Sequence, residues 1–201
     1  MINWLWRFRT PEDWIKMKVR ITDLSIDHTS AFTDWIADKQ AIKYTLSKFL
    51  PDRDEEWVML YIKSLIEDTS TWDQAIVLDD DIVVGYCGLS NISKQNRSAE
   101  YFIIIGNKKY WNAGIGTYAG SLVLDYGFSK MKLHRIWLTV SDLNHGAIKS
   151  YEKLGFTEEG HMKEACLRNG KFHDKVVMSI LENQWHTSQC RRPPEPGGFE
   201  K

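Results

Sequence analysis

The chain has 201 residues, and its 26 basic and 27 acidic side chains give a formal net charge of -1. This length fits one well-buried domain, and the balanced charge, without a long Lys/Arg run, argues against nucleic acid as a principal partner. Three scattered cysteines without CxxC spacing argue against a disulfide framework and a zinc site. No apolar stretch approaches the roughly 20 residues that span a bilayer, so we expect a cytoplasmic protein without membrane or metal.

Both ends of the chain differ in composition from the middle. Residues 1–16 carry several tryptophans ahead of the first predicted strand, and we expect an N-terminal arm there. Residues 183–201 are rich in Pro and Gly, which predicts a disordered C-terminal tail. The domain is therefore expected over residues 17–182.

The first half of this domain predicts one strand, two helices and three further strands. Apolar and charged residues alternate over 17–24, which indicates a strand. Helices are expected at 28–38 and from Asp52, which has capping-box spacing to Glu55. Three successive antiparallel strands are expected at 74–78, 82–89 and 99–105.

The second half alternates helix and strand. A helix over 115–126 has its apolar stripe at Ile115, Tyr118, Ala119, Leu122, Val123 and Tyr126. A strand at 134–140 is followed by a helix that begins at the N-cap Asn144 and ends at Gly155. The buried stripe of this second helix is Ala147, Ile148, Tyr151 and Leu154. Two last strands, 156–167 and 173–181, are joined by an Asn169-Gly170 hairpin signal.

Two glycines, Gly114 and Gly116, stand at the start of the helix over 115–126. Without Cβ atoms, they let backbone N–H groups approach an anion at a helix N-terminus, which predicts phosphate binding. With Ala119 they match the dinucleotide pattern G-x-G-x-x-A, but no strand directly precedes them and no acidic residue follows about 20 positions later. The nucleotide P-loop motif is absent.

The motif W-x-x-G-x-G-T at residues 111–117, followed by NHGAIKSYEKLGF at 144–156, resembles the GNAT superfamily of acetyl-CoA-dependent N-acetyltransferases. The similarity is strongest to the branch with ribosomal-protein N-terminal and spermidine acetyltransferases, and it extends over about residues 17–182. Asn112 departs from the glycine that is common next to the first position of the motif.

The resemblance implies an α/β fold, with a mixed (α+β) sheet flanked by helices. Strands four and five would splay apart to admit the pantetheine arm of acetyl-CoA, the co-substrate. The backbone of Ile103, Ile104 and Ile105 would bind the pantetheine amides, and Asn144 matches a position that bonds the cofactor. The predicted pyrophosphate loop is Trp111, Asn112, Ala113, Gly114, Ile115, Gly116 and Thr117.

Tyr151 matches the family tyrosine that protonates the coenzyme A sulfur. A phenol has a reference pKa of about 10, so it carries its proton at neutral pH. For the general base, Glu100 is the first candidate, and His134 and His173 are weaker ones. The acidic residues Asp52, Asp54, Glu55 and Glu56 either attract a cationic amine or stabilise their own helix.

The sequence thus predicts an enzyme that moves the acetyl group of acetyl-CoA to a primary amine by direct attack in a ternary complex. The acceptor is a protein N-terminus, a polyamine or an amino sugar. Two alternatives stay open: a non-catalytic acyl-CoA sensor and an aminoglycoside-type antibiotic acetyltransferase. The aromatic arm and the habit of the family favour a homodimer.

Overall fold

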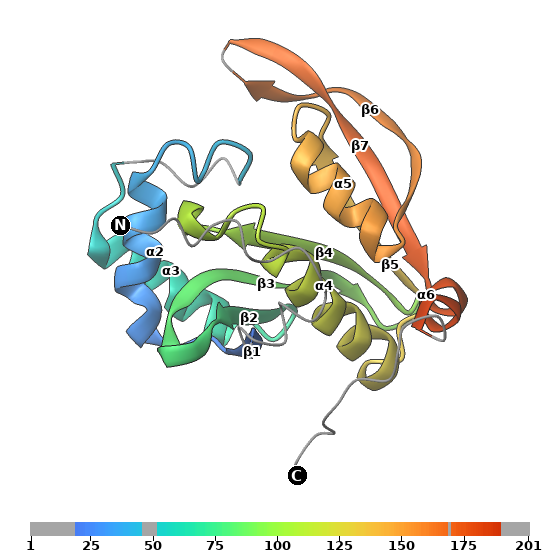
Figure 1. Ribbon diagram of the computed structural model, residues 1–201, viewed down its shortest axis with the longest axis horizontal. Coiled ribbons are helices and arrows are strands. Elements are labelled where there is room, and N and C mark those ends of the chain that lie inside the picture. Colours follow the sequence, from blue (N-terminus) through green and yellow to red (C-terminus); the bar gives the residue numbers. More distant parts are fainter. Residues whose placement is uncertain (1–18, 46–51, 169, 190–201) are drawn as a thin grey trace.

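A seven-stranded mixed sheet, in the order β1-β2-β3-β4-β5-β7-β6, forms the centre of the computed structural model (Figure 1). The structure describes residues 19–45, 52–168 and 170–189, so the predicted arm at 1–16 and Asn169 lie outside the described residues. The strands are β1 (Arg20–Asp23), β2 (Trp72–Val77), β3 (Val83–Ser93), β4 (Ser98–Ile105), β5 (Arg135–Ser141), β6 (Thr157–Arg168) and β7 (Lys171–Leu181). The mixed sheet confirms the predicted fold class.

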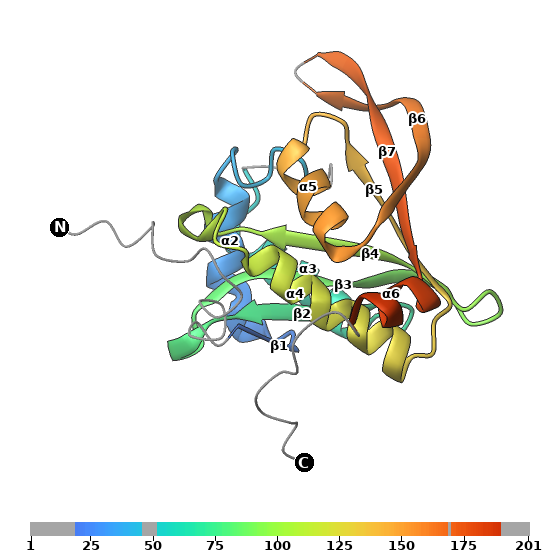
Figure 2. The ribbon, with the colours of Figure 1, turned by 45° about the vertical axis from the view of Figure 1, so that its right-hand side comes forward.

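Helices cover both faces of this sheet (Figures 1 and 2). The α-helices are α2 (Thr29–Ala37), α3 (Glu55–Glu67), α4 (Ile115–Asp125), α5 (His145–Leu154) and α6 (Glu182–Gln189). Short helical turns are η2 (Ile26–His28), η3 (Asp79–Asp81) and η4 (Lys108–Tyr110), and η5 (Tyr126–Lys130) is a π-helix.

Alternation along β4 divides the apolar interior into two clusters. Tyr101 belongs to the cluster under α4 and α5, whereas Phe102 and Ile104 pack against the cluster under α2 and α3. Successive side chains of a strand point to opposite faces, so Glu100 shares the α2/α3 face with Phe102. One strand therefore sends side chains to both sides of the sheet.

β4 and β5 run parallel, but they pair only from Ser98 to Glu100 and from Arg135 to Trp137. β5 stays paired with β7 as far as Ser141, and β4 stays paired with β3 as far as Ile105. The two strands consequently diverge beyond Glu100 and Trp137, as Figure 1 shows. This divergence is the splay that the resemblance implied.

Two helix predictions are corrected in detail. Asp54, not Asp52, caps α3: its Oδ1 accepts a hydrogen bond of 2.8 Å from the Trp57 N–H. On α4, Gly120 and Leu124 are buried, whereas Tyr126 is 37% exposed and stacks on Trp72. The predicted Tyr118 and Leu122 are only half-buried. The buried face is rotated because Gly120, without a side chain, allows its neighbours to pack closely against the helix.

The predicted boundary after residue 182 is also corrected. Residues 182–189 form α6, and its Trp185 side chain is fully buried next to Phe128, with ring centroids 6.3 Å apart. Burial of this indole joins the segment to the domain, so the first part of the expected tail is helical. The rest of that tail, 190–201, lies outside the described residues.

Candidate active site

The loop that leads into α4 contains two residues with positive φ, Asn112 and Gly114. Gly114 is the N-cap residue, with φ of 81° and ψ of -5°, a left-handed conformation that glycine adopts without strain. Asn112 also has positive φ, at 59°, and Asn tolerates this region better than most residues. Asn112 thus adopts a left-handed backbone conformation, a region that also favours glycine.

The first turn of α4 offers donors to an anion. The first backbone bond of this helix runs from the Tyr118 N–H to the Gly114 carbonyl, at 3.0 Å. The N–H groups of Ile115, Gly116 and Thr117 precede it and have no intrahelical acceptor. Together with the partial positive charge of a helix N-terminus, these donors fit a phosphate group.

Gly116 and Gly120 are glycines for different reasons. A Cβ on Gly116 would lie 3.6 Å from Ile105 Cγ1 and 3.9 Å from Ile103 Cδ1, which is ordinary contact. A Cβ on Gly120 would lie only 2.7 Å from the Leu154 Cδ1 and Tyr101 Oη atoms. Packing therefore requires glycine at 120, whereas at 116 it leaves room for a Cβ.

Trp111 fixes the loop to the end of β4. Its indole N–H donates to the Ile105 carbonyl at 2.7 Å, while the side chain stays 39% exposed. Ala113 packs against the cluster under α4 and α5. The predicted cofactor residue Trp111 thus holds the loop in place and occupies one backbone acceptor of β4.

The three predicted isoleucines differ in the direction of their backbone groups. The Gly106 N–H donates to the Val84 carbonyl on β3 at 2.9 Å. Because backbone groups alternate along an antiparallel strand, Ile104 also faces β3, whereas Ile103 and Ile105 face the side where β5 has diverged. The structure therefore exposes Ile103 and Ile105 along the open edge, and Ile104 does not share this edge.

One contact connects α4 with α5, and another caps the start of α5. The hydroxyl oxygens of Thr117 and Ser150 lie 2.7 Å apart. Asn144 caps α5 as predicted, since its Oδ1 accepts from the Ala147 N–H at 3.3 Å. Gly155 ends the helix with φ of 98°. The side chains of Thr117 and Asn144 are thus engaged within the protein.

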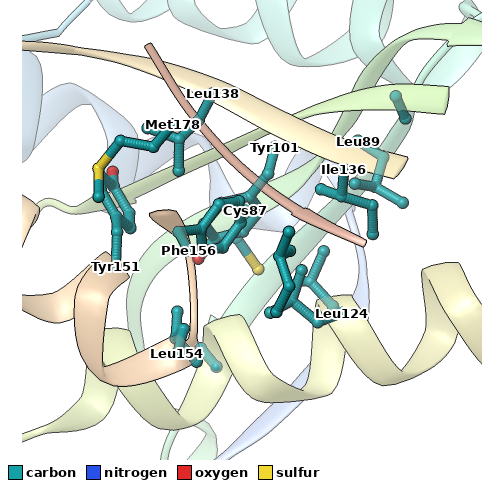
Figure 3. Close-up of a cluster of buried hydrophobic side chains, with 14 of the residues drawn as sticks. Cys87, Leu89, Tyr101, Leu124, Ile136, Leu138, Tyr151, Leu154, Phe156 and Met178 are labelled. Carbon is teal, nitrogen blue, oxygen red and sulfur yellow. The ribbon is translucent and has the colours of Figure 1, made fainter. Parts of the chain in front are cut away.

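Tyr151 lies on the inner face of α5 and is 9% exposed. Its ring extends from α5 toward Leu138 and Met178, which pair with each other on β5 and β7 (Figure 3). Leu138 directly follows the last residue of β5 that pairs with β4. Burial raises the pKa of Tyr151 to about 12, so the phenol keeps its proton at neutral pH. A proton donor thus lies beside the point where the strands diverge.

Glu100 lies at the divergence point but on the other face of the sheet. It is the last residue of β4 paired with β5, opposite Trp137, and its carboxylate accepts from the Asn91 side chain at 2.6 Å. Glu100 and Tyr151 therefore flank the divergence from opposite faces. The structure does not bring them into contact.

The weaker candidates lie elsewhere. His134 is next to the start of β5, where its backbone N–H bonds the Arg97 carbonyl. His173 is on β7, opposite Cys166 in the β6–β7 hairpin. Glu55 and Glu56 are in the first turn of α3, where acidic side chains stabilise a helix.

Sequence reasoning missed two contacts at the wide end of the diverging strands. The Tyr44 hydroxyl donates to the Leu143 carbonyl at 3.1 Å, and Arg168 donates to the Thr45 carbonyl at 3.3 Å. They connect the segment after α2 with the β5–α5 loop and with the end of β6. Contacts between residues so far apart leave no local pattern in a sequence.

The sequence matches a family model, the acetyltransferase (GNAT) domain, over residues 18–157. The chain belongs to the GNAT acetyltransferase family. One relative, the spermidine N(1)-acetyltransferase of Escherichia coli, is 34% identical over 110 residues, which cover 55% of this chain and 59% of that protein. The matched region thus spans less than two thirds of this relative.

Two further GNAT proteins extend the comparison. A putative ribosomal N-acetyltransferase, YdaF of Bacillus subtilis, is 31% identical over 56% of this chain and 61% of its own length. The spermidine N-acetyltransferase of Vibrio cholerae, solved in complex with CoA and spermine, superposes with a TM-score of 0.77 at 25% identity. This similarity covers 84% of the present chain and 98% of the Vibrio chain.

The geometry of this GNAT chain fits coenzyme A at the positions expected from its fold. Ile103 offers backbone groups along the open edge of β4, where the Ile105 carbonyl already accepts from Trp111, and the first turn of α4 offers N–H donors. Within the described ranges, no cluster of three or more His, Cys, Asp or Glu side chains is arranged to hold a metal ion. None of the described helices has the length and apolarity needed to cross a bilayer.

Proposed function

We propose that this GNAT protein transfers the acetyl group of acetyl-CoA to a primary amine. One observation carries the proposal: β4 and β5 separate directly beside the buried phenol of Tyr151, and the strand edge so opened leads to the donors of α4. The open edge suits an extended amide chain, and the helix N-terminus suits its phosphates. The complex of the Vibrio relative with CoA supports this assignment.

In the proposed reaction, the acyl-CoA thioester supplies an activated acetyl group. The N–H groups of Ile115, Gly116 and Thr117 hold the pyrophosphate, and the backbone of Ile103 aligns the arm. This alignment places the thioester beside Tyr151, and fixed orientation of two reactants supplies a large part of many rate enhancements.

Tyr151 acts as the general acid. The amine nitrogen attacks the thioester carbonyl carbon, the C–S bond breaks, and the departing sulfur takes the phenol proton of Tyr151. A phenol that stays protonated because it is buried is suited to this step. Solvent returns the proton after the products leave.

The attacking amine must also lose a proton. Glu100 flanks the divergence from the α2/α3 face, opposite Tyr151, and we propose it as the base, acting directly or through water. Acid and base would then approach the reacting atoms from the two faces of the sheet. A Glu100→Gln variant should lose activity most at low pH, where the amine is fully protonated.

For the acceptor we propose a polyamine, because two relatives are spermidine acetyltransferases. The test is release of free thiol from acetyl-CoA with spermidine, spermine, an N-terminal ribosomal peptide, glucosamine and an aminoglycoside as acceptors. Mass spectrometry of the product then identifies the acetylated nitrogen. Turnover restricted to the peptide or the aminoglycoside would contradict the polyamine while preserving the enzyme class.

A non-catalytic sensor is the alternative function. It predicts tight binding of acetyl-CoA in a calorimetric titration and no thiol release with any acceptor. That pair of results would reject the transferase.

A further inference from the structure

Tyr101 is the first residue of β4 beyond the last pair with β5. Its side chain is only 2% exposed and belongs to the same cluster as Tyr151, under α4 and α5. The ring thus lies directly beneath the point where the two strands diverge. Tyr101 lies outside the two motif segments, residues 111–117 and 144–156.

Three aromatic rings meet at this position (Figure 3). Tyr101 meets Tyr151 edge to face, with centroids 6.0 Å apart and planes at 84°. Phe156 stacks on Tyr101 at 5.9 Å and meets the ring of Tyr151 at 6.0 Å and 62°. The ring of Tyr151 is therefore supported by two other rings, one from β4 and one from Phe156, which follows the C-cap Gly155 of α5.

The hydroxyl of Tyr101 does not contribute a hydrogen bond. Among the residues that the structure describes, none hydrogen-bonds its buried Oη atom, and a Cβ on Gly120 would lie 2.7 Å from it. A buried hydroxyl without a partner lowers stability. The ring of Tyr101, not its hydroxyl, is thus the part that the site uses.

We propose that Tyr101 is a positioning residue, whose ring holds the phenol of Tyr151 at the point where β4 and β5 diverge. The inference rests on the proposed function for its kinetic consequence. Edge-to-face contact fixes both the distance and the tilt of the second ring, since the positive edge of one ring meets the negative face of the other. Replacing Tyr101 with an aliphatic residue frees the Tyr151 ring to tilt.

The kinetic test compares Tyr101→Leu with Tyr101→Phe. In Tyr101→Leu, kcat should fall by about 10- to 100-fold, because small misplacements of catalytic groups have effects of this size, while KM for acetyl-CoA stays within about twofold. Tyr101→Phe keeps the ring and removes the unpaired hydroxyl, so kcat should be unchanged and Tm should rise. Equal kcat in Tyr101→Leu and the parent, or equal losses in both variants, would overturn the proposal.

Repeating the Tyr101→Leu substitution in the Tyr151→Phe variant distinguishes a positioning role of Tyr101 from a general packing role. In Tyr151→Phe, the proton donor is already absent, so adding Tyr101→Leu should cause little further loss of kcat. A loss as large as in the parent background would mean that Tyr101 acts on the site by another route. If Tyr101→Leu does not fold, Tyr101→Met, which fills more of the same volume, takes its place in each comparison.

A third measurement does not depend on activity. In tyrosine-labelled protein, the nuclear Overhauser contacts from the Tyr151 ring to Leu138 and Met178 report where the ring lies. The Tyr151 signals are identified by their loss in Tyr151→Phe, and the contacts should change in Tyr101→Leu and stay the same in Tyr101→Phe. Changed contacts in a protein that acetylates no amine would reject the proposed function but support the positioning. Unchanged contacts in Tyr101→Leu would reject the positioning, whatever the activity.

Discussion

The hydroxyl oxygen of Thr117, in the first turn of α4, lies 2.7 Å from the hydroxyl oxygen of Ser150, the residue before Tyr151 on α5. This contact joins the helix that carries the anion donors to the helix that carries the phenol. The position of α4 relative to α5 is therefore set in part by two side chains, Thr117 and Ser150, that take no chemical part in the proposed reaction.

This hydroxyl pair can be tested with a double-mutant cycle. Thr117→Val and Ser150→Ala should each lower stability by about 0.5–1.5 kcal/mol, the usual net contribution of one hydrogen bond. The double variant should have about the same free energy of unfolding as the less stable of the two single variants, because the contact is lost only once. Urea unfolding measures all four proteins, and strictly additive losses would show that the hydroxyls do not interact.

Tyr151→Phe retains the ring and removes the proton that the phenol donates. We expect kcat to fall by about 10²–10⁴-fold, the usual contribution of a positioned general acid, with an unchanged Kd for acetyl-CoA. Single-turnover rates should be measured as well, because slow product release hides the chemical step. A native single-turnover rate in the folded variant would remove Tyr151 from the mechanism.

The two glycines of α4 provide a matched comparison. Gly116→Val should weaken acetyl-CoA binding in a calorimetric titration much more than it lowers Tm, since a Cβ at this position makes only ordinary contacts with Ile105 and Ile103. Gly120→Ala should instead lower stability by about 1–3 kcal/mol, because the new Cβ lies too close to Leu154 and Tyr101. Unchanged affinity in folded Gly116→Val would place the phosphate site elsewhere.

The ion pair between Arg135 and Glu159 predicts a pH dependence. The Arg135 guanidinium and the Ser179 hydroxyl bond the Glu159 carboxylate and lower its pKa from 4.5 to about 2. A depressed folded pKa adds stability above the unfolded value, and this stability is lost as the pH falls from about 4.5 to about 2.

The measurement compares Tm of Glu159→Gln and the parent between pH 7 and pH 2.5. The variant should be less stable at pH 7, and the difference should shrink through the acidic range. The effect will be small, because the carboxylate side chain is 38% exposed and solvent screens the pair. A difference that stays constant with pH would contradict the assigned cause.

The buried indole of α6 gives the largest expected loss of stability. Trp185→Ala should cost about 3–5 kcal/mol, as for other fully buried tryptophans, because it leaves a cavity beside Phe128. His186→Ala, at the exposed neighbouring position, is the control and should stay within about 0.5 kcal/mol of the parent. Similar midpoints for both variants in urea would mean that α6 is not part of the cooperative unit.

Structural features that depend on a few neighbouring residues were predicted well from the sequence. Asn144 and Gly155 form the caps of α5 because a cap depends on a few neighbouring residues. The divergence of β4 and β5 came from the family resemblance instead, since strand pairing depends on residues far apart in the chain.

The features that could not be predicted from the sequence depend on tertiary packing. Pro and Gly farther along dominate the composition of the C-terminal segment, whereas Trp185 is ordered by a contact with Phe128, which no local pattern shows. The role of Tyr101 depends on Tyr151 and Phe156, so alternation along β4 alone identifies it only as a core residue.

Beyond Glu100 and Trp137, the facing edges of β4 and β5 do not pair with each other. Unpaired strand edges can recruit strands from other chains, which is a route to aggregation. A ligand that binds only the folded state stabilises it by mass action, by about 2.7 kcal/mol at 100 times its Kd. If acetyl-CoA fills this gap, its concentration changes the stability of the folded protein as well as the rate of turnover.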